Sequence, residues 1–321
     1  TWPAHATPGV NRGYIENFLR PDGTLAALTA ACGPVVYRAG ALGEEFRGDV
    51  FICEAAGNLV KRLKLGQAGG LPRASNAYTR TEFLRSTDER FRPVNLVVGP
   101  DGALYVLDMY RGLIQHKTYV TPFLARQVEA RGLESPLMLG RIYRVSGSPG
   151  ALRRTERLSA ATDAQLAKLL SDPDGWWRDS AQRLLIERRA VGEVPEIRGI
   201  AEHGRNAAAR VAALWTLEGL GHLSELDVLE ALNGEPAVAI AACQLAEGFM
   251  HNDGITARIA DLGRSQDRQV RIQAAASLGE SKGLASRLCE VLRRNLDDRY
   301  IRGAVMTGLS GREVAALRLL A

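Results

Sequence analysis

Cysteine is scarce in this sequence: only Cys32, Cys53, Cys243 and Cys289 occur among its 321 residues. None stands in a CxxC or CxxCH spacing, so the chain encodes neither a cysteine-rich zinc site nor a covalent haem attachment site. Cys243 and Cys289 fall in helical apolar patterns and are expected to be core residues. Cys32 and Cys53 flank a predicted strand, and they could either stay free or bridge in an oxidising compartment.

Long apolar runs and lysine are also rare. No stretch is long enough to cross a bilayer, so no membrane span is expected in this chain. Of the 41 basic residues, 5 are lysines and 36 are arginines, and the net charge is +5. The densest basic clusters, Arg153-Arg154 and Arg188-Arg189, fall in predicted helices with acids interspersed, which indicates a solvated surface and predicts no nucleic-acid partner. The absence of GxSxG, phosphate-loop and dinucleotide motifs disfavours a hydrolase, a kinase or a Rossmann dehydrogenase.

Both ends of the sequence indicate a fragment. The chain begins at Thr1 without an initiator methionine or a signal peptide, and it stops inside a helical pattern at 311–321. The lack of a targeting segment therefore carries no information about location.

Up to about residue 146, short strands alternate with glycine, proline and aspartate turns. Residues 48–55 form an apolar run suited to a sheet, and residues 59–65 alternate apolar and basic side chains. Pro100, Asp101 and Gly102 predict a tight turn between two further strands. The spacing predicts two antiparallel blades of a β-propeller, with strands at 35–38, 49–54 and 59–65, and at 94–98, 103–108 and 140–145.

Two blades cannot close a propeller ring of ~4–8 blades. The fold expected for residues 1–146 is therefore the C-terminal part of a β-propeller, with further blades upstream. Residues 117–139 interrupt the second blade. Thr121 as N-cap, Pro122 at the first helical position and Gly132 past the end predict a short helix there.

Residues 147–321 show a helical period instead. Five segments can be aligned on one reference residue each, and successive reference residues are 28 to 33 positions apart. In every segment a small residue follows three positions after the reference residue, and a leucine follows seven positions after it. This period predicts about five helical hairpins that resemble the short HEAT repeats of bacteria. The reference residues are Arg178, Arg210, Val238, Arg271 and Arg302, the small residues are Ala181, Ala213, Ala241, Ala274 and Val305, and the leucines are Leu185, Leu217, Leu245, Leu278 and Leu309.

The order of the N-terminal motifs resembles a known family. "CGPVVYR", "FRGDVFICEAAGNLVKR", "EFLRSTDERFRPVNLVVGPDGALYVLDMYRGLIQH" and "LGRIYRV", followed by HEAT-like repeats, are similar to bacterial membrane-bound dehydrogenases. The propellers of that family are similar to glucose/sorbosone dehydrogenases, and a C-terminal c-type cytochrome domain with a CxxCH motif is common in it. The resemblance covers most of residues 1–146 and extends loosely over the helical repeats.

The resemblance implies a periplasmic or otherwise extracytoplasmic dehydrogenase, membrane-associated through missing segments, that oxidises a sugar or another alcohol. The implied cofactors are pyrroloquinoline quinone with Ca²⁺, and haem c on a missing C-terminal domain. Two features depart from the family pattern. Residues 57–61 lack the histidines that many relatives carry there, and no CxxCH motif is present.

His116 is the candidate catalytic base, with Asp108 and Arg111 beside it in the sequence. An imidazole titrates near neutrality, and an adjacent carboxylate would orient it to take a proton from a substrate hydroxyl. In the alternative interpretation His116 bonds a carbonyl between blades, and Asp108 and Arg111 form a pair that fixes the strand end. Glu54 and Asn58 bracket a blade turn and could supply oxygen ligands to Ca²⁺, although Asn58 could equally serve only as a turn residue.

Two classes of function remain open from the sequence. The first is a fragment of a redox enzyme whose propeller carries the active site and takes a sugar or alcohol substrate. The second is a non-catalytic scaffold or binding protein, with a protein partner on the HEAT-like surface.

Overall fold

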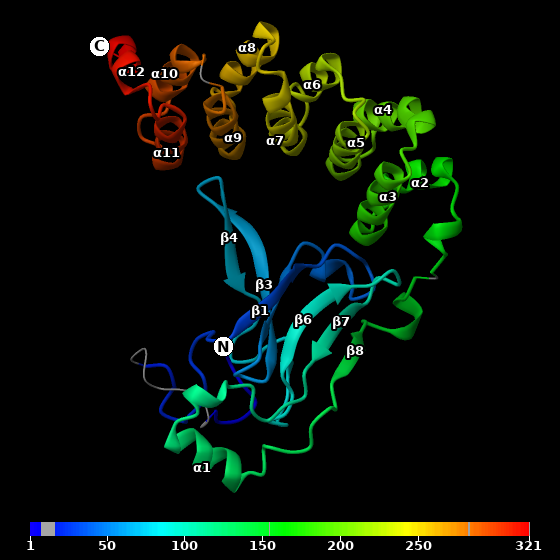
Figure 1. Cartoon of the computed structure of the whole chain (residues 1–321), viewed down its shortest axis with the longest axis vertical. Helices are drawn as coiled ribbons and strands as arrows, with labels where there is room; N and C mark the ends of the chain where they lie inside the picture. The colour runs from blue at the N-terminus through cyan, green and yellow to red at the C-terminus, as the bar shows by residue number, and fades with distance from the viewer. Residues whose placement is uncertain (8–16, 154, 282, 321) are drawn as a thin grey trace. The chain divides into compact units, whose positions relative to one another are not determined.

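The computed structural model describes residues 1–7, 17–153, 155–281 and 283–320. The chain divides into two compact units. The sheet unit comprises residues 1–67 and 72–155, and the helical unit comprises residues 156–321 together with 68–71. The expected order of a sheet region followed by a helical region is thus confirmed (Figure 1). The described strands form no closed barrel.

The first sheet has the order β1-β2-β3-β4, with β5 paired to β3. The expected first strand at 35–38 was placed too late, because β1 begins at Ala31 and a bulge between Cys32 and Val35 carries the pairing past Gly33 and Pro34. The expected third strand was too short, because it continues to Ala68 and returns as β4. Gly69 and Gly70 both adopt positive φ in the turn, which suits a two-residue hairpin. The strands are β1 (Ala31–Val36), β2 (Val50–Glu54), β3 (Leu59–Ala68), β4 (Leu71–Asn76) and β5 (Leu84–Arg85).

The second sheet is an antiparallel meander of β6 (Pro93–Val98), β7 (Leu104–Asp108) and β8 (Arg141–Val145). The turn before β7 forms as its residues predict. Gly102 has φ of 79°, and the Asp101 carboxylate accepts a hydrogen bond from the amide of Ala103 at 3.1 Å.

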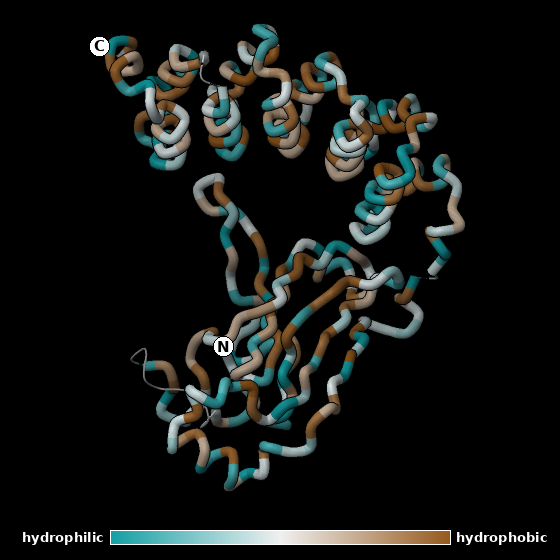
Figure 2. The backbone as a smooth tube through the Cα atoms, in the orientation of Figure 1, coloured by the Kyte–Doolittle hydropathy of each residue, from teal (hydrophilic) through white to brown (hydrophobic). Residues whose placement is uncertain are grey.

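One apolar core lies between these two sheets, because β1 and β2 both pack against β6. Tyr37 ties it together: the hydroxyl donates to the Gly102 carbonyl at 2.7 Å and accepts from the Leu42 amide at 2.8 Å. In Figure 2, β6 and β7 carry the hydrophobic stretches that this core requires. Its buried members include Phe51, Cys53, Val60, Phe91, Leu96, Leu104 and Val106.

The insertion between β7 and β8 contains η2 (Lys117–Tyr119) and α1 (Pro122–Ala130). The Thr121 side chain caps α1 by accepting from the Leu124 amide at 3.2 Å, and Gly132 has φ of 59° after the last turn. These are the helix start and stop that the sequence predicts.

The helical unit consists of two rows of helices that pack pairwise (Figure 1). In one row α3, α5, α7, α9 and α11 follow one another, and in the other α4, α6, α8, α10 and α12 do so. Figure 2 shows hydrophobic and hydrophilic residues alternating along these helices, as amphipathic packing requires. The helices are α2 (Asp163–Leu169), α3 (Gly175–Glu187), α4 (Val194–His203), α5 (Ala207–Gly219), α6 (Glu225–Ala231), α7 (Pro236–Leu245), α8 (Asp253–Leu262), α9 (Arg268–Gly279), α10 (Ala285–Arg294), α11 (Arg299–Gly308) and α12 (Glu313–Leu320). Short 3₁₀ turns occur at η1 (Glu44–Phe46), η3 (Pro149–Ala151), η4 (Leu158–Ala160), η5 (Val191–Glu193) and η6 (Ala246–Phe249).

The residue pattern that defines the repeats forms the core of this unit. Every aligned small residue and every aligned leucine is buried, including Ala213 and Leu217 at 0% exposure. Aligned arginines bond main-chain carbonyls ahead of their own helices. Arg271 donates to the Ser265 carbonyl at 2.6 Å, and Arg302 likewise donates to the carbonyl of Leu296. Each of these arginines joins the start of its helix to the segment that precedes it.

Among the described residues, no helix combines the length and apolarity needed to cross a bilayer.

Candidate functional site

His116 lies on the surface of the insertion. Its side chain is exposed, and Nδ1 accepts a hydrogen bond from the Thr118 amide at 3.2 Å, which caps η2. The ring contacts Tyr119 edge to face, with 6.0 Å between the ring centroids. Within the described part of the chain, no hydrogen bond or ion pair joins His116 to a carboxylate. The structure therefore does not bring His116 together with Asp108.

Asp108 ends β7 and is 3% exposed. Its Oδ1 accepts from the amides of Arg92 at 2.7 Å and Tyr110 at 2.8 Å, so the carboxylate holds Tyr110 at its φ of 47°. Oδ2 has no hydrogen-bond partner among the described residues. No ion pair joins Asp108 to Arg111 in the described ranges, and both residues contact Arg92 instead.

Glu54, the first candidate Ca²⁺ ligand, is fully buried at the end of β2. Its Oε2 accepts from the Thr29 amide at 2.7 Å, and Oε1 accepts from the amides of Ala30 and Ala56, both at 3.1 Å. Because backbone N–H groups already satisfy both oxygens, Glu54 offers no free oxygen to a cation. The Glu54 carboxylate instead fixes the loop at 29–30 against the turn at 56.

Asn58, the second candidate ligand, is 1% exposed and has φ of 56°, the left-handed conformation of a turn residue. Its Nδ2 donates to the carbonyls of Phe91 at 2.6 Å and Glu89 at 3.2 Å. Among the described residues no group of three or more His, Cys, Asp or Glu side chains is placed to hold a metal ion. Glu54 and Asn58 thus do not fit the Ca²⁺ of a quinone cofactor.

Arg92, which the sequence did not single out, lies where these residues converge. Its Nε donates to the Arg111 carbonyl at 2.9 Å, and Nη1 and Nη2 donate at 2.8 Å to the carbonyls of Ala55 and Gly112. No carboxylate forms an ion pair with Arg92 in the described part of the chain. Burial lowers the pKa of this guanidinium. The negative charge of the Glu89 carboxylate, the next largest influence, raises that pKa but does not cancel the effect of burial.

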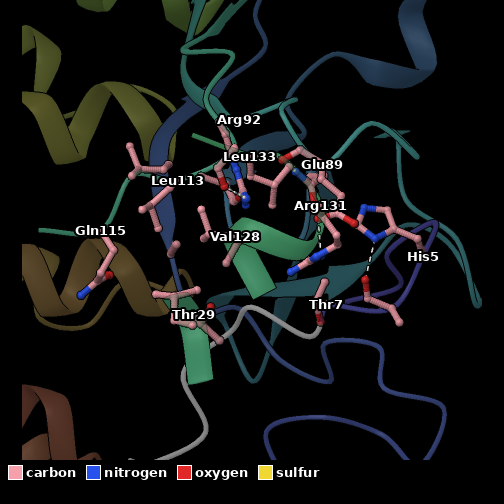
Figure 3. A pocket seen from close by; sticks show the side chains of 18 of the residues that line it. His5, Thr7, Thr29, Glu89, Arg92, Leu113, Gln115, Val128, Arg131 and Leu133 are labelled. Atoms are coloured by element: carbon pink, nitrogen blue, oxygen red, sulfur yellow. Dashed lines mark hydrogen bonds and ion pairs between the residues drawn. The ribbon is translucent and has the colours of Figure 1, made fainter. Parts of the chain in front are cut away.

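A cavity of about 370 Å³ opens beside Arg92, lined by residues of the sheet unit alone. Figure 3 shows Arg92, Glu89 and Arg131 in its wall, with Gln115 and His5 at opposite sides of the view. Leu113, Val128 and Leu133 supply an apolar part of the lining. The residues that Glu54 and Asn58 hold in place, Thr29, Ala30, Ala56 and Glu89, also line it. Glu54 and Asn58 therefore act on this cavity by positioning its walls.

The polar groups of the cavity are not equally satisfied. Arg131 pairs with Glu89 and also donates from Nε to the Gln127 carbonyl at 3.0 Å. His5 bonds only through Nδ1, 2.6 Å from the Ala6 carbonyl oxygen, and its buried Nε2 has no partner among the described residues. A guanidinium has more N–H donors than the carbonyl bonds of Arg92 use. The cavity thus combines a cation without a paired carboxylate, an unsatisfied ring nitrogen and an apolar side.

Sequence reasoning missed Arg92 because its partners are backbone carbonyls far along the chain. The one available signal was its place directly before Pro93, at the start of a strand that the pattern did predict.

Residues 4–148 match the family model described as a domain of unknown function (DUF7133). No curated protein and no solved structure matches the chain.

Proposed function

We propose that the sheet unit is part of a β-propeller and that the helical unit is a HEAT-like solenoid. Two antiparallel meanders that share one core support the propeller, because adjacent blades pack in this way. Two rows of paired helices with a buried small residue and leucine per repeat support the solenoid.

The function we propose for the sheet unit is binding of a small polyhydroxylated ligand, a sugar or sugar acid, in the Arg92 cavity. The observation that carries this proposal is the Arg92 guanidinium, which faces the cavity without an ion-paired carboxylate. A ligand carboxylate would supply the missing negative charge, and ligand hydroxyls could bond His5 Nε2 and Gln115. The apolar wall of Leu113 and Val128 suits the C–H face of a sugar ring.

This ligand would be the substrate in the dehydrogenase interpretation. In that interpretation the chain belongs to an extracytoplasmic, quinone- or haem-linked enzyme that oxidises a sugar or another alcohol, with the cofactors held outside the described residues. The support for it is the resemblance of the N-terminal motifs, together with a cavity of suitable size. The candidate base His116 is untested in this role, and we do not include it in the proposal because no carboxylate pairs with it among the described residues.

A non-catalytic binding or scaffold protein is the second candidate. The observation in its favour is the exposed His116, which has neither an acid to orient it nor a place in the cavity lining. In this case the helical unit would hold a protein partner on its surface. A visible spectrum of the full-length protein, with a sugar and alcohol panel, separates the two candidates, because only the enzyme should show a haem or quinone band that is reduced by substrate.

Titration calorimetry with neutral monosaccharides, sugar alcohols and sugar acids tests the binding proposal itself. We expect sugar acids to bind about 5–10-fold more tightly than the matching neutral sugars, since one charge-assisted bond contributes on this scale. His5→Ala should weaken binding about 3–10-fold by removing a ring nitrogen from the cavity. His222→Ala, at an exposed histidine of the helical unit, is the matched control and should bind as the wild type does. Equal affinity for acids and neutral sugars, or no binding by any of them, would overturn the proposal.

A further inference from the structure

Cys32 and Cys53 lie directly opposite each other on neighbouring strands. Their Cα atoms are register partners in the antiparallel pair of β1 and β2. Directly opposed residues of an antiparallel pair project to the same face of the sheet. Cys53 is part of the apolar core between the sheets, and Cys32 packs against that same core from a half-buried position.

The spacing of such a pair suits a disulfide. Opposed Cα atoms in antiparallel strands are about 4.5–5.5 Å apart, and disulfides occur at Cα separations of about 4.4–6.8 Å. Neither thiol has a strong competing partner: Cys32 makes a weak 3.8 Å hydrogen bond to the Pro93 carbonyl, and both cysteines are free. The other two cysteines are buried in the core of the helical unit.

We propose that Cys32 and Cys53 form a cross-strand disulfide when the chain folds in the presence of a disulfide oxidant. The Cys32 thiolate attacks the oxidant RSSR and forms a mixed disulfide, releasing one RS⁻. The Cys53 thiolate then attacks the Cys32 sulfur and releases the second RS⁻. The two thiol protons pass to these thiolates, so two electrons leave the cysteines and two RSH form.

Burial determines when this reaction can occur. Burial is the main cause that raises the pKa of Cys32, and it raises that of Cys53 to about 12, so few thiolates exist in the folded chain. Cys53 is also fully buried, which excludes an external oxidant from its sulfur. Oxidation therefore proceeds faster during folding than afterwards, as for a protein that folds in an oxidising compartment.

The cross-link would fix a part of the sheet that the backbone pairing leaves irregular. The β-bulge of β1 follows Cys32 directly, and Gly33 in that bulge packs closely on Asn95 of β6. A disulfide at Cys32 would hold the register on one side of the bulge while Gly33 contacts the second sheet. This inference does not depend on what the Arg92 cavity binds.

The test is to fold the full chain from denaturant in a buffer of reduced and oxidised glutathione and to measure its mass and its peptides. We expect a mass about 2 Da below that of the fully reduced chain, and a non-reducing digest in which the Cys32 and Cys53 peptides are joined. The double variant Cys243→Ala with Cys289→Ala should give the same loss. Cys32→Ala should show no cross-link and should keep the Cys53 thiol free.

Three results would overturn the inference. They are four free thiols in the folded chain, a stable glutathione adduct on Cys32 that Cys53 does not displace, or a cross-link that includes Cys243 or Cys289. Circular dichroism of each variant shows whether the strands and helices have formed. A second readout is thermal: reductant should lower the melting temperature of the oxidised wild type and leave that of Cys32→Ala unchanged.

Discussion

Arg92 donates a 2.8 Å hydrogen bond from Nη1 to the carbonyl oxygen of Ala55, and so ties the turn after β2 to the residue before β6. The same guanidinium bonds the carbonyls of Arg111 and Gly112 in the segment after β7. One side chain thus joins three separate segments around the cavity, and it does so without an ion-paired carboxylate among the described residues.

Arg92→Met should destabilise the sheet unit by about 2–4 kcal/mol, because it leaves partly buried carbonyls without donors. Urea unfolding followed by near-ultraviolet circular dichroism measures the change. Arg126→Met, at an exposed arginine of α1, is the matched control and should stay within about 0.5 kcal/mol of the wild type. An Arg92→Met chain as stable as this control would show that the carbonyl bonds contribute little.

Ala213→Asp should abolish cooperative unfolding of the helical unit. Ala213 has no exposed surface in the core of α5, so the substitution buries a charge without a partner. Ala208→Asp, on the exposed face of the same helix near its N-terminus, should unfold as the wild type does. Thermal unfolding at 222 nm distinguishes the two, and similar melting of both variants would mean that the repeats pack in another register.

Asp298 should make the helical unit sensitive to acid. The side-chain hydrogen bond from Arg268, with 2.5 Å between Nε and Oδ2, is the main cause that lowers the pKa of this carboxyl from 3.8 to about 2. A carboxyl with a lowered folded-state pKa stabilises the fold above its unfolded value and loses that contribution as the pH falls. The wild type should therefore lose stability between about pH 4 and pH 2 more steeply than Asp298→Asn.

Asn at position 298 can still cap α11, because its side-chain oxygen can accept from the first amides of the helix as the Asp298 carboxylate does. Denaturant unfolding at several pH values provides the comparison. Parallel pH profiles for the two chains would contradict the coupling between Asp298 and Arg268.

His116→Gln should leave stability and sugar binding unchanged and should alter turnover of the full-length protein less than about tenfold. The reason is geometric: the imidazole is exposed, caps η2 and has no acid beside it in the described structure. A general base contributes about 10²–10⁴-fold to the rate. A loss of turnover in that range would establish His116 as the base after all.

The sequence predicted best the features that local chemistry determines. The repeat of small residue and leucine fixes which face of each helix is buried, and Thr121, Pro122 and Gly132 bound α1 through their own backbone preferences. The β3–β4 hairpin was missed although Gly69-Gly70 is a hairpin signal, because residues 66–76 are mostly small or polar and exposed and so lack the apolar alternation of a half-buried strand.

The cavity could not be predicted in the same way. The sequence singled out Glu54 and Asn58 as candidate Ca²⁺ ligands and Asp108 as a candidate catalytic residue, but their partners are main-chain amides and carbonyls up to 33 residues away in the sequence. Main-chain groups carry no sequence signal, so side-chain types alone could not separate a positioning role from a ligand or catalytic role.

Hydrogen exchange of the full chain, with and without the sugar acid that binds most tightly, tests the central claim most directly. We predict slower exchange of amides in residues 29–30, 55–56 and 112–115, which line the Arg92 cavity, and unchanged exchange across α2 to α12. Protection confined to the helical unit, or none anywhere at saturating ligand, would contradict the assignment of this cavity as a binding site.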